Sequence, residues 1–336
     1  MKHYPAITVV MPVLNEAKHL ADAVTSVVEQ HYPGDMEILL AMGTSTDGTD
    51  DVAAALAAAD SRIRLIPNPH NLTTVGLNEA IRQAKHDIIV RIDAHSQPTV
   101  GYFANGVHVL DEQGADLVGG IMDARGRSAF QKAVAWAYTS RFGIGGANFH
   151  VGGEAGEAES AYLGIFRKSA LQRVGGYDES IVRGEDWDLA QRIKKTGGLV
   201  WFSPELRVIY WPRGRFDRLV KQFYSTGVWR GDLTRRDVAG APVRYFAPPV
   251  LVAGVAVGLA MASAGVLIGL VPAATYLVGA AALAVTARGL SLKSRIALMI
   301  VLPTIHFSWG WGFWVGFVRG AGQTVDRSRV TSKGKS

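Results

Sequence analysis

The sequence contains, at residues 88–95, the run Ile88-Ile89-Val90-Arg91-Ile92-Asp93-Ala94-His95, in which mostly β-branched apolar residues lead to an acidic one. A short run of this kind is typical of a central parallel strand that is buried on both faces. Ligands of open α/β sheets bind outside the carboxyl ends of the strands, so Asp93 and His95 are placed to face a bound group. Together they can hold a divalent ion against a diphosphate. Alternatively, Asp93 caps the next segment and His95 is a solvated loop residue.

Strands and helices are expected to alternate on both sides of this run. Before it we expect strands at 7–14, 36–41 and 63–66, and helices at 16–30, 51–59 and 74–84. After it we expect a helix at 102–112, strands at 116–121 and 162–167, a short helix ending near 174, and a further helix within 183–198. This alternation predicts a mostly parallel sheet, so the fold class is α/β. Residues 125–160 are rich in Gly and Ala without a clear period, and we interpret them as a mobile loop near the site.

Two polar clusters follow the first two expected strands. Asn15 suits a helix N-cap, and Glu16 after it suits the positive end of the helix dipole. Residues 43–50 form a turn cluster of small polar residues that opens a helix. Backbone N–H groups at such a helix start can equally receive a phosphate. Both clusters therefore have a structural and a ligand-binding interpretation.

The helix expected within 183–198 begins with Glu185-Asp186-Trp187-Asp188 and ends with basic residues and glycine. Acids at the start and bases at the end both complement the helix dipole, and this alone would explain the charges. The dipole does not explain Trp187, which stands between two carboxylates. We expect Trp187 to be exposed in the first turn.

Apolar residues gather near the C-terminal end of the sequence. The chain has 336 residues, 48% of them hydrophobic, and residues 245–287 contain no charged residue. That length suffices for two crossings of a hydrocarbon core. A third apolar segment, residues 296–318, makes three membrane segments our preferred interpretation, although three crossings would place the basic residues after it outside, against the positive-inside tendency. The alternative is a third segment that is re-entrant or interfacial.

Composition and charge narrow the class of protein. The absence of cysteine excludes a disulfide framework and thiolate metal sites, and it agrees with a reducing compartment. The first residues lead into a strand without a signal peptide, so we expect the α/β part to stay in the cytoplasm. The net charge is +6, and Arg and Lys are dense from residue 207 to residue 236, just before the first apolar span. This position favours an anionic membrane surface or a lipid phosphate as partner over nucleic acid, for which the sequence has no binding motif.

Residues 210–244 alternate basic and aromatic side chains. The apolar positions with helical spacing are Phe216, Leu219, Val220 and Phe223. We expect an interfacial helix here rather than a buried one, because an apolar span follows it. Arg213 and Arg215 would meet a lipid phosphate.

Six short motifs occur in a specific order over residues 7–200. They are Val9-Val10-Met11-Pro12-Val13-Leu14-Asn15-Glu16, Ser45-Thr46-Asp47-Gly48-Thr49, Gly76-Leu77-Asn78, Asp93-Ala94-His95, Gly175-Gly176-Tyr177-Asp178-Glu179 and Glu185-Asp186. Their order and spacing resemble the family 2 inverting glycosyltransferases with a GT-A fold, a Rossmann-like fold with a mostly parallel sheet. The Asp-Ala-His motif and the apolar C-terminal part are similar to bacterial exopolysaccharide glycosyltransferases of the succinoglycan type. After Trp211 the resemblance is one of topology alone.

The resemblance implies a role for each of these residues. Asp93 and His95 would hold Mn²⁺ or Mg²⁺ together with the donor diphosphate, and Asp186 would be the catalytic base. The other residues that would contact the nucleotide-sugar donor are Pro12, Asn15, Glu16, Asp47, Gly76 and Asn78. The residues that would contact the acceptor are Glu185, Trp187, Arg213 and Arg215.

The sequence departs from the family pattern at three points. Met42 and Gly43 stand where most of the family has aspartates that read the base of the nucleotide. The resemblance implies a UDP-sugar as donor, and the absence of these aspartates leaves GDP- and dTDP-sugars as alternatives. The metal motif is Asp-x-His rather than Asp-x-Asp, and imidazole is an acceptable ligand for manganese. The Gln-x-x-Arg-Trp signature of processive synthases is absent, so we expect one sugar to be transferred per encounter.

The predicted organisation has four parts: a GT-A domain at 1–209, a basic aromatic interfacial segment at 210–244, a transmembrane region of two or three helices at 245–320 and a basic tail at 321–336. The expected function is that of a membrane-anchored, metal-dependent inverting glycosyltransferase. It would lie at the inner (plasma) membrane, with its catalytic domain in the cytoplasm, and add a sugar to a lipid-linked acceptor during cell-surface polysaccharide or glycolipid assembly.

Two alternatives stay open. The first is a polyprenyl-phosphate glycosyl synthase, in which the lipid phosphate is the acceptor and needs no base. The second is a catalytically silent membrane scaffold with the same fold, which Met42 and Gly43 would suit. Two acidic clusters that converge on one site argue against the scaffold, because a silent fold has no use for them.

Overall fold

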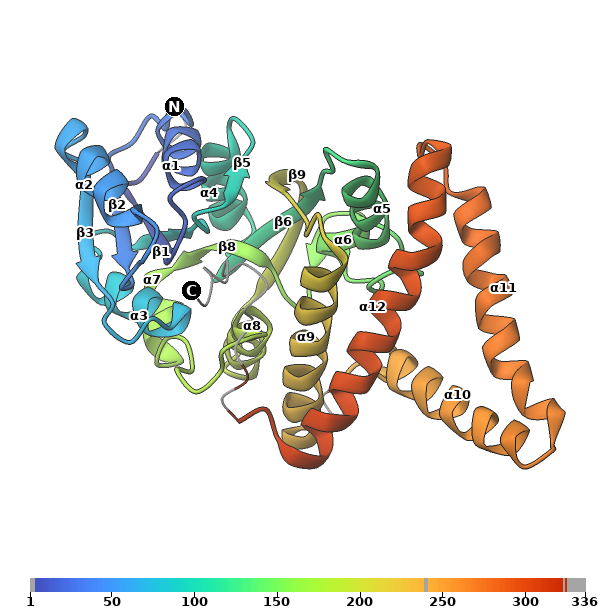
Figure 1. The fold of residues 1–336 in the computed structure, drawn as a ribbon. Helices are drawn as coiled ribbons and strands as arrows, with labels where there is room; N and C mark the ends of the chain where they lie inside the picture. Colours follow the sequence, from blue (N-terminus) through green and yellow to red (C-terminus); the bar gives the residue numbers. More distant parts are fainter. Residues whose placement is uncertain (1–3, 239–240, 323, 325–336) are drawn as a thin grey trace. The chain divides into compact units, whose positions relative to one another are not determined.

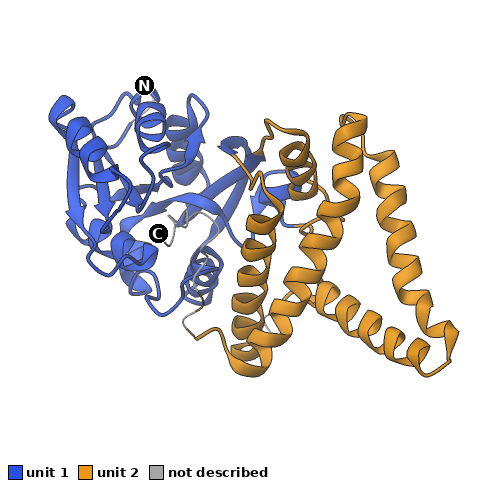
Figure 2. Cartoon of the chain, viewed as in Figure 1, with its two compact units in different colours: residues 1–123, 147–210 blue, residues 124–146, 211–336 orange. Residues whose placement is uncertain are grey.

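The computed structural model describes residues 4–238, 241–322 and 324. The chain divides into two compact units, residues 1–123 with 147–210 and residues 124–146 with 211–336 (Figure 2). The first unit is an α/β domain, and the second is helical (Figure 1). Residues 124–146 group with the second unit, although they fall inside the range that we assigned to the α/β part. Most of the predicted basic tail lies outside the described residues.

The first unit is built on a mixed sheet. The strands are β1 (Ile7–Val13), β2 (Met36–Met42), β3 (Ile63–Pro67), β4 (Ile88–Arg91), β5 (Ser96–Pro98), β6 (Leu117–Ala124), β7 (Gly156–Glu157), β8 (Tyr162–Arg167) and β9 (Val200–Tyr210). Their order is β3-β2-β1-β4-β8-β6-β9-β5, with β7 paired to β9. The four neighbouring strands β3, β2, β1 and β4 are parallel to one another. Strand β8 runs antiparallel to both β4 and β6. The predicted α/β fold class is confirmed.

Helices cover both faces of this sheet. They are α1 (Leu20–Val28), α2 (Thr49–Ala59), α3 (Thr73–Gln83), α4 (Tyr102–Glu112), α6 (Asn148–Val151), α7 (Lys168–Arg173) and α8 (Glu185–Lys195). One buried cluster joins the sheet to α1 and α4, and a second joins its other face to α3 and α8. Successive residues of β1 alternate between the clusters, because neighbouring side chains of a strand point to opposite faces. Val9 and Met11 lie in the first cluster and Val10 in the second.

Strand register brings the functional loops to one edge of the sheet. Val10 of β1 pairs with Arg91 of β4, and Pro12 of β1 pairs with Ala41 of β2. Because the three strands are parallel, their carboxyl ends meet at the same edge. The loops that carry Asn15, residues 43–48 and Asp93 therefore start side by side.

Two expectations about local structure are wrong. The helix expected from residue 16 begins at Leu20 with His19 at its N-cap position, and Asn15 is not the cap. Asn15 instead has a left-handed backbone with φ 56°, and its side chain accepts a hydrogen bond from the backbone of Thr46. The stretch interpreted as a mobile loop contains helix α5 (Ala129–Tyr138), which starts at a capping box formed by Ser128 and Gln131.

The elements of the second unit that the structure describes are mainly helices. Besides α5 they are α9 (Phe216–Arg236), η1 (Val243–Phe246), α10 (Ala247–Ser263), η2 (Leu267–Leu270), α11 (Val271–Thr286) and α12 (Leu292–Arg319). Helices α9 and α12 run side by side in close contact (Figure 1). A Cβ added at Gly227 or Gly231 of α9 would overlap carbonyl oxygens of α12, and one at Gly312 or Gly316 of α12 would overlap carbonyl oxygens of α9. Small residues four apart on both helices therefore let the two backbones approach closely.

This packing bears on the segment that we expected to be interfacial. Residues 216–236 do form one helix, as the spacing predicted. Leu219 and Phe223 are buried and Phe216 is exposed, so α9 has one face covered by protein. We predicted an interfacial helix rather than a buried one, and a half-buried helix fits neither description alone. Its position relative to a membrane stays a prediction.

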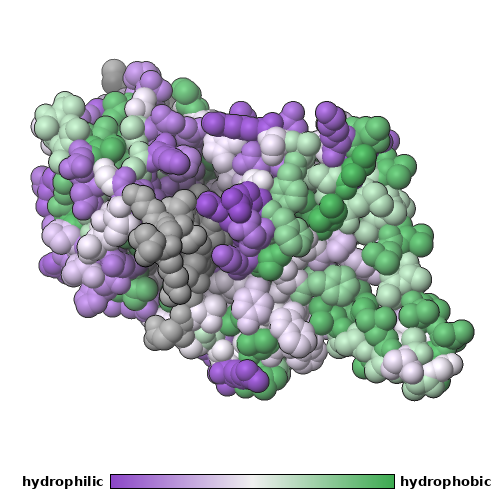
Figure 3. Space-filling view, viewed as in Figure 1, coloured by the Kyte–Doolittle hydropathy of each residue, from purple (hydrophilic) through white to green (hydrophobic). Residues whose placement is uncertain are grey.

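Among the described residues of the second unit, three helices are long and apolar enough to cross a membrane. These candidate spans are Val243–Ser263, Leu267–Thr286 and Leu292–Arg319. Their exposed side chains include many apolar ones, among them Val257, Leu277 and Val278, and hydrophobic side chains cover much of α10, α11 and α12 in Figure 3. An apolar surface of this extent is typical of contact with lipid or with another protein.

Candidate active site

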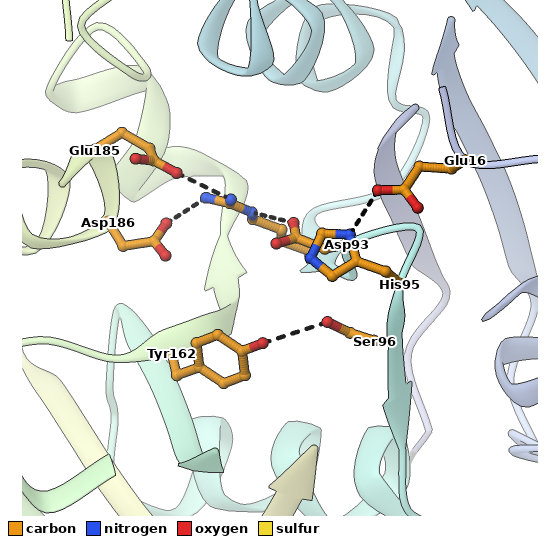
Figure 4. Close-up of polar contacts among 8 residues, drawn as sticks. Glu16, Asp93, His95, Ser96, Tyr162, Glu185 and Asp186 are labelled. Atoms are coloured by element: carbon orange, nitrogen blue, oxygen red, sulfur yellow. Dashed lines mark hydrogen bonds and ion pairs between the residues drawn. The ribbon is translucent and has the colours of Figure 1, made fainter. Parts of the chain in front are cut away.

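Asp93 and His95 lie in the turn that follows β4, at the edge of the sheet where β1 and β2 also end. His95 Nδ1 is 2.9 Å from Oε1 of Glu16, which belongs to the loop after β1 (Figure 4). Asp93 Oδ1 accepts a hydrogen bond of 3.1 Å from Nε of Arg91. Two residues that we assigned to the metal and one that we assigned to the nucleotide pocket are thus brought together.

A buried arginine joins this loop to the start of α8. Arg91 is 3% exposed. Its Nη1 donates to Oδ1 of Asp186, and its Nη2 donates to Oε1 of Glu185 over 3.1 Å (Figure 4). The guanidinium also lies 5.6 Å from the centre of the Tyr177 ring. Asp93, the metal-ligand candidate, and Asp186, the base candidate, therefore both accept hydrogen bonds from the Arg91 guanidinium.

Sequence reasoning did not assign a role to Arg91. Its signal was present, because Arg91 is a charged residue inside an apolar strand run. A charge in such a position must be paired or hydrogen-bonded to be tolerated. The partners lie 94 and 95 positions further along the chain, so the sequence alone did not identify them.

The electrostatics of Asp186 differ from our expectation. We expected the dipole of α8 to favour its carboxylate form. Burial instead raises the pKa of Asp186, and the nearby carboxylates of Glu185 and Asp93 raise it further, while the Arg91 guanidinium opposes them. Desolvation outweighs the dipole here because the side chain is only 26% exposed.

The charges and donor atoms of this cluster suit a divalent cation. One guanidinium faces three carboxylates, which leaves negative charge in excess when all are ionised. When a histidine donates its Nδ1–H to a carboxylate, as His95 can to Glu16, its Nε2 carries the lone pair that binds metals. Among the described residues, no group of three or more His, Cys, Asp or Glu is arranged to hold a metal. Asp93 and His95 stay the candidate ligands, and oxygens of a bound diphosphate are a further class of ligand that Mn²⁺ or Mg²⁺ accepts.

The residues predicted to line the nucleotide pocket tie two loops together. Asp47 accepts hydrogen bonds from the backbone of Thr49 at 3.2 Å and of Ala17 at 3.3 Å. Burial opposes ionisation of Asp47, but the hydrogen bond that it accepts from the Thr49 hydroxyl, together with these backbone hydrogen bonds, prevails and lowers its pKa. The backbone N–H of Glu16 donates to the Thr49 hydroxyl over 2.9 Å. Asp47 and Glu16 thus lie together at the edge of the sheet.

Asn78 and Gly76 have evident structural functions. The Asn78 amide bonds both backbone groups of Tyr177, over 2.8 and 2.9 Å, and the carboxylate of Glu179 over 3.0 Å. It thereby supports the loop that places Tyr177 under Arg91. Gly76 packs α3 against β2, since an added Cβ would lie 3.1 Å from that of Ala41. Contact of either residue with a donor stays a prediction.

The acceptor candidates fall into two groups. Trp187 is half-buried, not exposed as we expected, because its indole donates a hydrogen bond of 3.0 Å to Glu159. Glu159 had no predicted role. Arg213 and Arg215 belong to the second unit, where Arg213 is buried and Arg215 is paired with a neighbouring aspartate at 2.9 Å.

Comparisons with known proteins bear on the family and the fold of the chain. The model of the family described as Glycosyl transferase family 2 matches residues 8–175. The succinoglycan biosynthesis protein ExoA of Rhizobium meliloti (strain 1021) is 31% identical to this chain, over 91% of the chain and 93% of ExoA. A dolichyl N-acetyl-α-D-glucosaminyl phosphate 3-β-D-2,3-diacetamido-2,3-dideoxy-β-D-glucuronosyltransferase of Methanococcus voltae is 24% identical, over 68% of this chain and 74% of that protein.

A solved structure shares the fold. The mannosyltransferase PcManGT of Pyrobaculum calidifontis, solved with GDP-Man and Mn²⁺, superposes with a TM-score of 0.57 at 19% identity, over 95% of this chain and 88% of that one. The predicted GT-A-like fold and the similarity to succinoglycan-type enzymes are confirmed. This chain belongs to glycosyl transferase family 2.

Proposed function

We propose that this glycosyltransferase moves a sugar from a nucleotide-sugar to a lipid-linked acceptor, with inversion at the anomeric carbon. The observation that carries the proposal is the convergence of Asp93 and Asp186 on Arg91. Asp93 comes from the end of β4, and Asp186 comes from the start of α8. An inverting transfer needs charge neutralisation on the leaving diphosphate and a base for the incoming hydroxyl, and these two positions would supply them.

On the donor side, Asp93 and His95 would hold Mn²⁺ or Mg²⁺, which supplies Lewis-acid neutralisation of charge on the diphosphate when bound. Glu16 orients His95 through its hydrogen bond to Nδ1. Pro12, Asn15 and Asp47, at the ends of β1 and β2, would contact the nucleotide. A UDP-sugar is the proposed donor, with GDP- and dTDP-sugars to be tested beside it.

On the acceptor side, Asp186 would accept the proton of the attacking hydroxyl. The bond between the anomeric carbon and the diphosphate oxygen breaks as the bond to the acceptor oxygen forms, and the nucleoside diphosphate leaves. In-line attack from the opposite face of the sugar inverts the anomeric centre. Glu185 and Trp187, held beside Asp186 by Arg91 and Glu159, would orient the acceptor.

A lipid-linked acceptor is supported by two observations. In the part of the second unit that the structure describes, three helices are long and apolar enough to span a membrane. The Methanococcus voltae relative is named for transfer to a dolichyl phosphate-linked sugar. Arg215 precedes the first candidate span and is exposed, so it would meet the lipid phosphate. Arg213 also precedes the span, but its burial argues against direct contact with that phosphate. We place the enzyme at the inner (plasma) membrane, with its α/β unit in the cytoplasm.

The test combines a donor screen with one substitution. Thermal shifts with UDP-, GDP- and dTDP-sugars in the presence of Mn²⁺ would identify the donor. Asp186→Asn keeps the size of the side chain and removes its charge, so donor and Mn²⁺ binding should persist while transfer falls by about a hundredfold, the lower range for a positioned base. Glu112→Gln, an exposed change on α4, is the control.

Other results of the same test would overturn the proposal. Retained transfer by Asp186→Asn would indicate a phosphate acceptor, as in a polyprenyl-phosphate glycosyl synthase. Absence of transfer in the wild type, with every donor that binds, would indicate a silent scaffold. Loss of donor binding together with activity would place Asp186 in the nucleotide pocket.

A further inference from the structure

Arg91 uses each of its three side-chain nitrogens on a different carboxylate. Nε donates to Asp93 and Nη2 to Glu185, each over 3.1 Å, and Nη1 donates to Asp186. Arg91 lies in β4, which is between β1 and β8 in the sheet. Arg91 pairs with Val10 of β1. Its position is therefore set by the hydrogen-bonded strands at the centre of the sheet.

We propose that Arg91 is a positioning residue that couples the donor side of the site, at Asp93, to the acceptor side, at Asp186. This inference rests on the proposed function for the identity of those two sides. Arg91 would act through its neighbours, since it touches the two acids and is almost fully covered.

The geometry of the guanidinium explains why an arginine stands here. Its nitrogens form a rigid planar fork, so a shift of one partner changes the distances to the others. Asp93 and Asp186 come from elements far apart in the sequence, and Arg91 contacts both. A lysine would keep the positive charge on a compact ammonium group at the end of a flexible stem. It would not fix the distance and orientation between the two carboxylates.

One positive charge shared among three acids also makes their interactions interdependent. When a divalent cation takes a share of Asp93, more of the guanidinium charge is available to Glu185 and Asp186. Loading of the donor side would thus strengthen the bonds that aim Asp186 at the acceptor. By reciprocity, a change at Asp186 would shift the affinity of the Asp93 side for the cation, although binding itself persists.

A second arginine of the same sheet provides the matched control. Arg167 on β8 donates to the carbonyl oxygens of Ala115 and Leu110 and to Asp111, over 2.9–3.1 Å. These partners hold the sheet to α4 and include none of the candidate site acids. Arg167→Lys therefore repeats the chemical change of Arg91→Lys without touching the site.

The experiment is a double-mutant cycle on the full chain in detergent, with Arg91→Lys, Asp186→Asn and the double variant. Binding of Mn²⁺ in the presence of UDP is measured by calorimetry, and transfer is measured with the donor that the thermal-shift screen identifies. We expect Arg91→Lys to lower kcat by about a hundredfold, as for loss of a positioned base, with little change in the KM for the donor. We expect Arg167→Lys to leave both unchanged.

The cycle separates positioning from a merely structural role. We expect the double variant to transfer no more slowly than Asp186→Asn alone, because Arg91 would act through Asp186. We also measure the factor by which Asp186→Asn changes Mn²⁺ affinity, once with Arg91 present and once with Arg91→Lys. We expect these two factors to differ about fivefold or more, which is the lower range of coupling between sites. Independent, multiplying losses in kcat and equal effects on Mn²⁺ affinity would overturn the inference.

Failure of the proposed function gives a different pattern. If Asp186 is not the base, Asp186→Asn alone retains transfer, whereas the Mn²⁺ cycle still reports whether Arg91 couples the two acids. If Arg91→Lys does not fold, a double variant with Arg91→Met and Glu185→Gln replaces it. This variant removes one positive and one negative charge, so the net charge of the cluster is unchanged. That variant should fold and transfer about a hundredfold more slowly than Glu185→Gln alone. Equal rates for the two would overturn the inference.

Discussion

His95 Nδ1 lies 2.9 Å from Glu16 Oε1, which ties the turn after β4 to the loop after β1. The Glu16 side chain is almost fully buried, so its carboxylate is held at the ring. Histidines that bind metals commonly donate their second nitrogen to a carboxylate, which fixes the tautomer and the ring orientation. Under the proposed function, Glu16 would therefore orient His95 as a metal ligand, besides any contact with the nucleotide.

Glu16→Gln should weaken metal binding without unfolding the domain. The amide keeps the shape of the side chain but loses the charge that favours the Nδ1–H tautomer, so we expect Mn²⁺ affinity to fall about 10–100-fold. Calorimetric titration with Mn²⁺ and UDP measures this change, with Glu112→Gln as control. Unchanged affinity in Glu16→Gln would mean that His95 is not a ligand.

The two proposed ligands should respond differently to substitution. Asp93→Ala removes a carboxylate and leaves Arg91 with two acids in place of three, so both metal and guanidinium lose a partner. His95→Asp supplies a carboxylate that can still hold the ion. We expect Asp93→Ala to lose far more transfer activity, measured at saturating Mn²⁺. Equal losses in the two variants would remove the metal assignment.

Transfer should depend on pH through Asp186. Burial raises the pKa of this carboxyl, so it stays protonated up to a higher pH than an ordinary aspartate. A protonated Asp186 cannot accept the hydroxyl proton, and kcat/KM should therefore fall as the pH is lowered through the raised pKa. A profile from about pH 5 to about pH 9 measures this, since kcat/KM reports groups of the free enzyme.

Two further measurements make the pH profile specific. Binding of UDP with Mn²⁺, followed over the same pH range, separates loss of donor from loss of the base. In Asp186→Asn the acidic limb assigned to this residue should disappear from the remaining activity. A limb that persists there belongs to another group and contradicts the assignment.

The sequence predicted the parts of the fold that depend on local patterns. Alternating apolar strands and helices were enough to expect β1 to β4 with their helices, and the uncharged stretch from residue 245 was enough to expect membrane helices. Helix α5 was missed because its start depends on the Ser128–Gln131 capping box within a run without clear period. Strand β9 was missed because its polar and apolar residues alternate only in part.

The sequence predicted the acidic residues of the candidate site, but it did not predict the Arg91 side chain that joins them. Asp93 and Asp186 stand at the ends of elements, where the pattern of apolar and polar residues marks them. Arg91 and Glu159 act through partners distant in sequence, and such pairings follow from sheet order and packing, which a single sequence does not specify. The pKa of Asp186 was misjudged for the same reason, since burial is a property of the tertiary structure.

Close packing of α9 on α12 should make particular glycines sensitive to the smallest substitution. A Cβ at Gly231 would overlap the carbonyl oxygen of Phe313, and backbone cannot move aside as a flexible side chain can. Overpacking of this kind costs about 1–3 kcal/mol of unfolding free energy. Gly254→Ala on α10 is the matched control, since nothing lies within 4 Å of its added Cβ and alanine is the better helix former, by about 1 kcal/mol. Thermal unfolding in detergent should show a lower midpoint for Gly231→Ala and an equal or higher one for Gly254→Ala. If both variants melt at or above the wild-type temperature, the two helices do not pack through these glycines, and α9 is free to lie at an interface as its sequence first indicated.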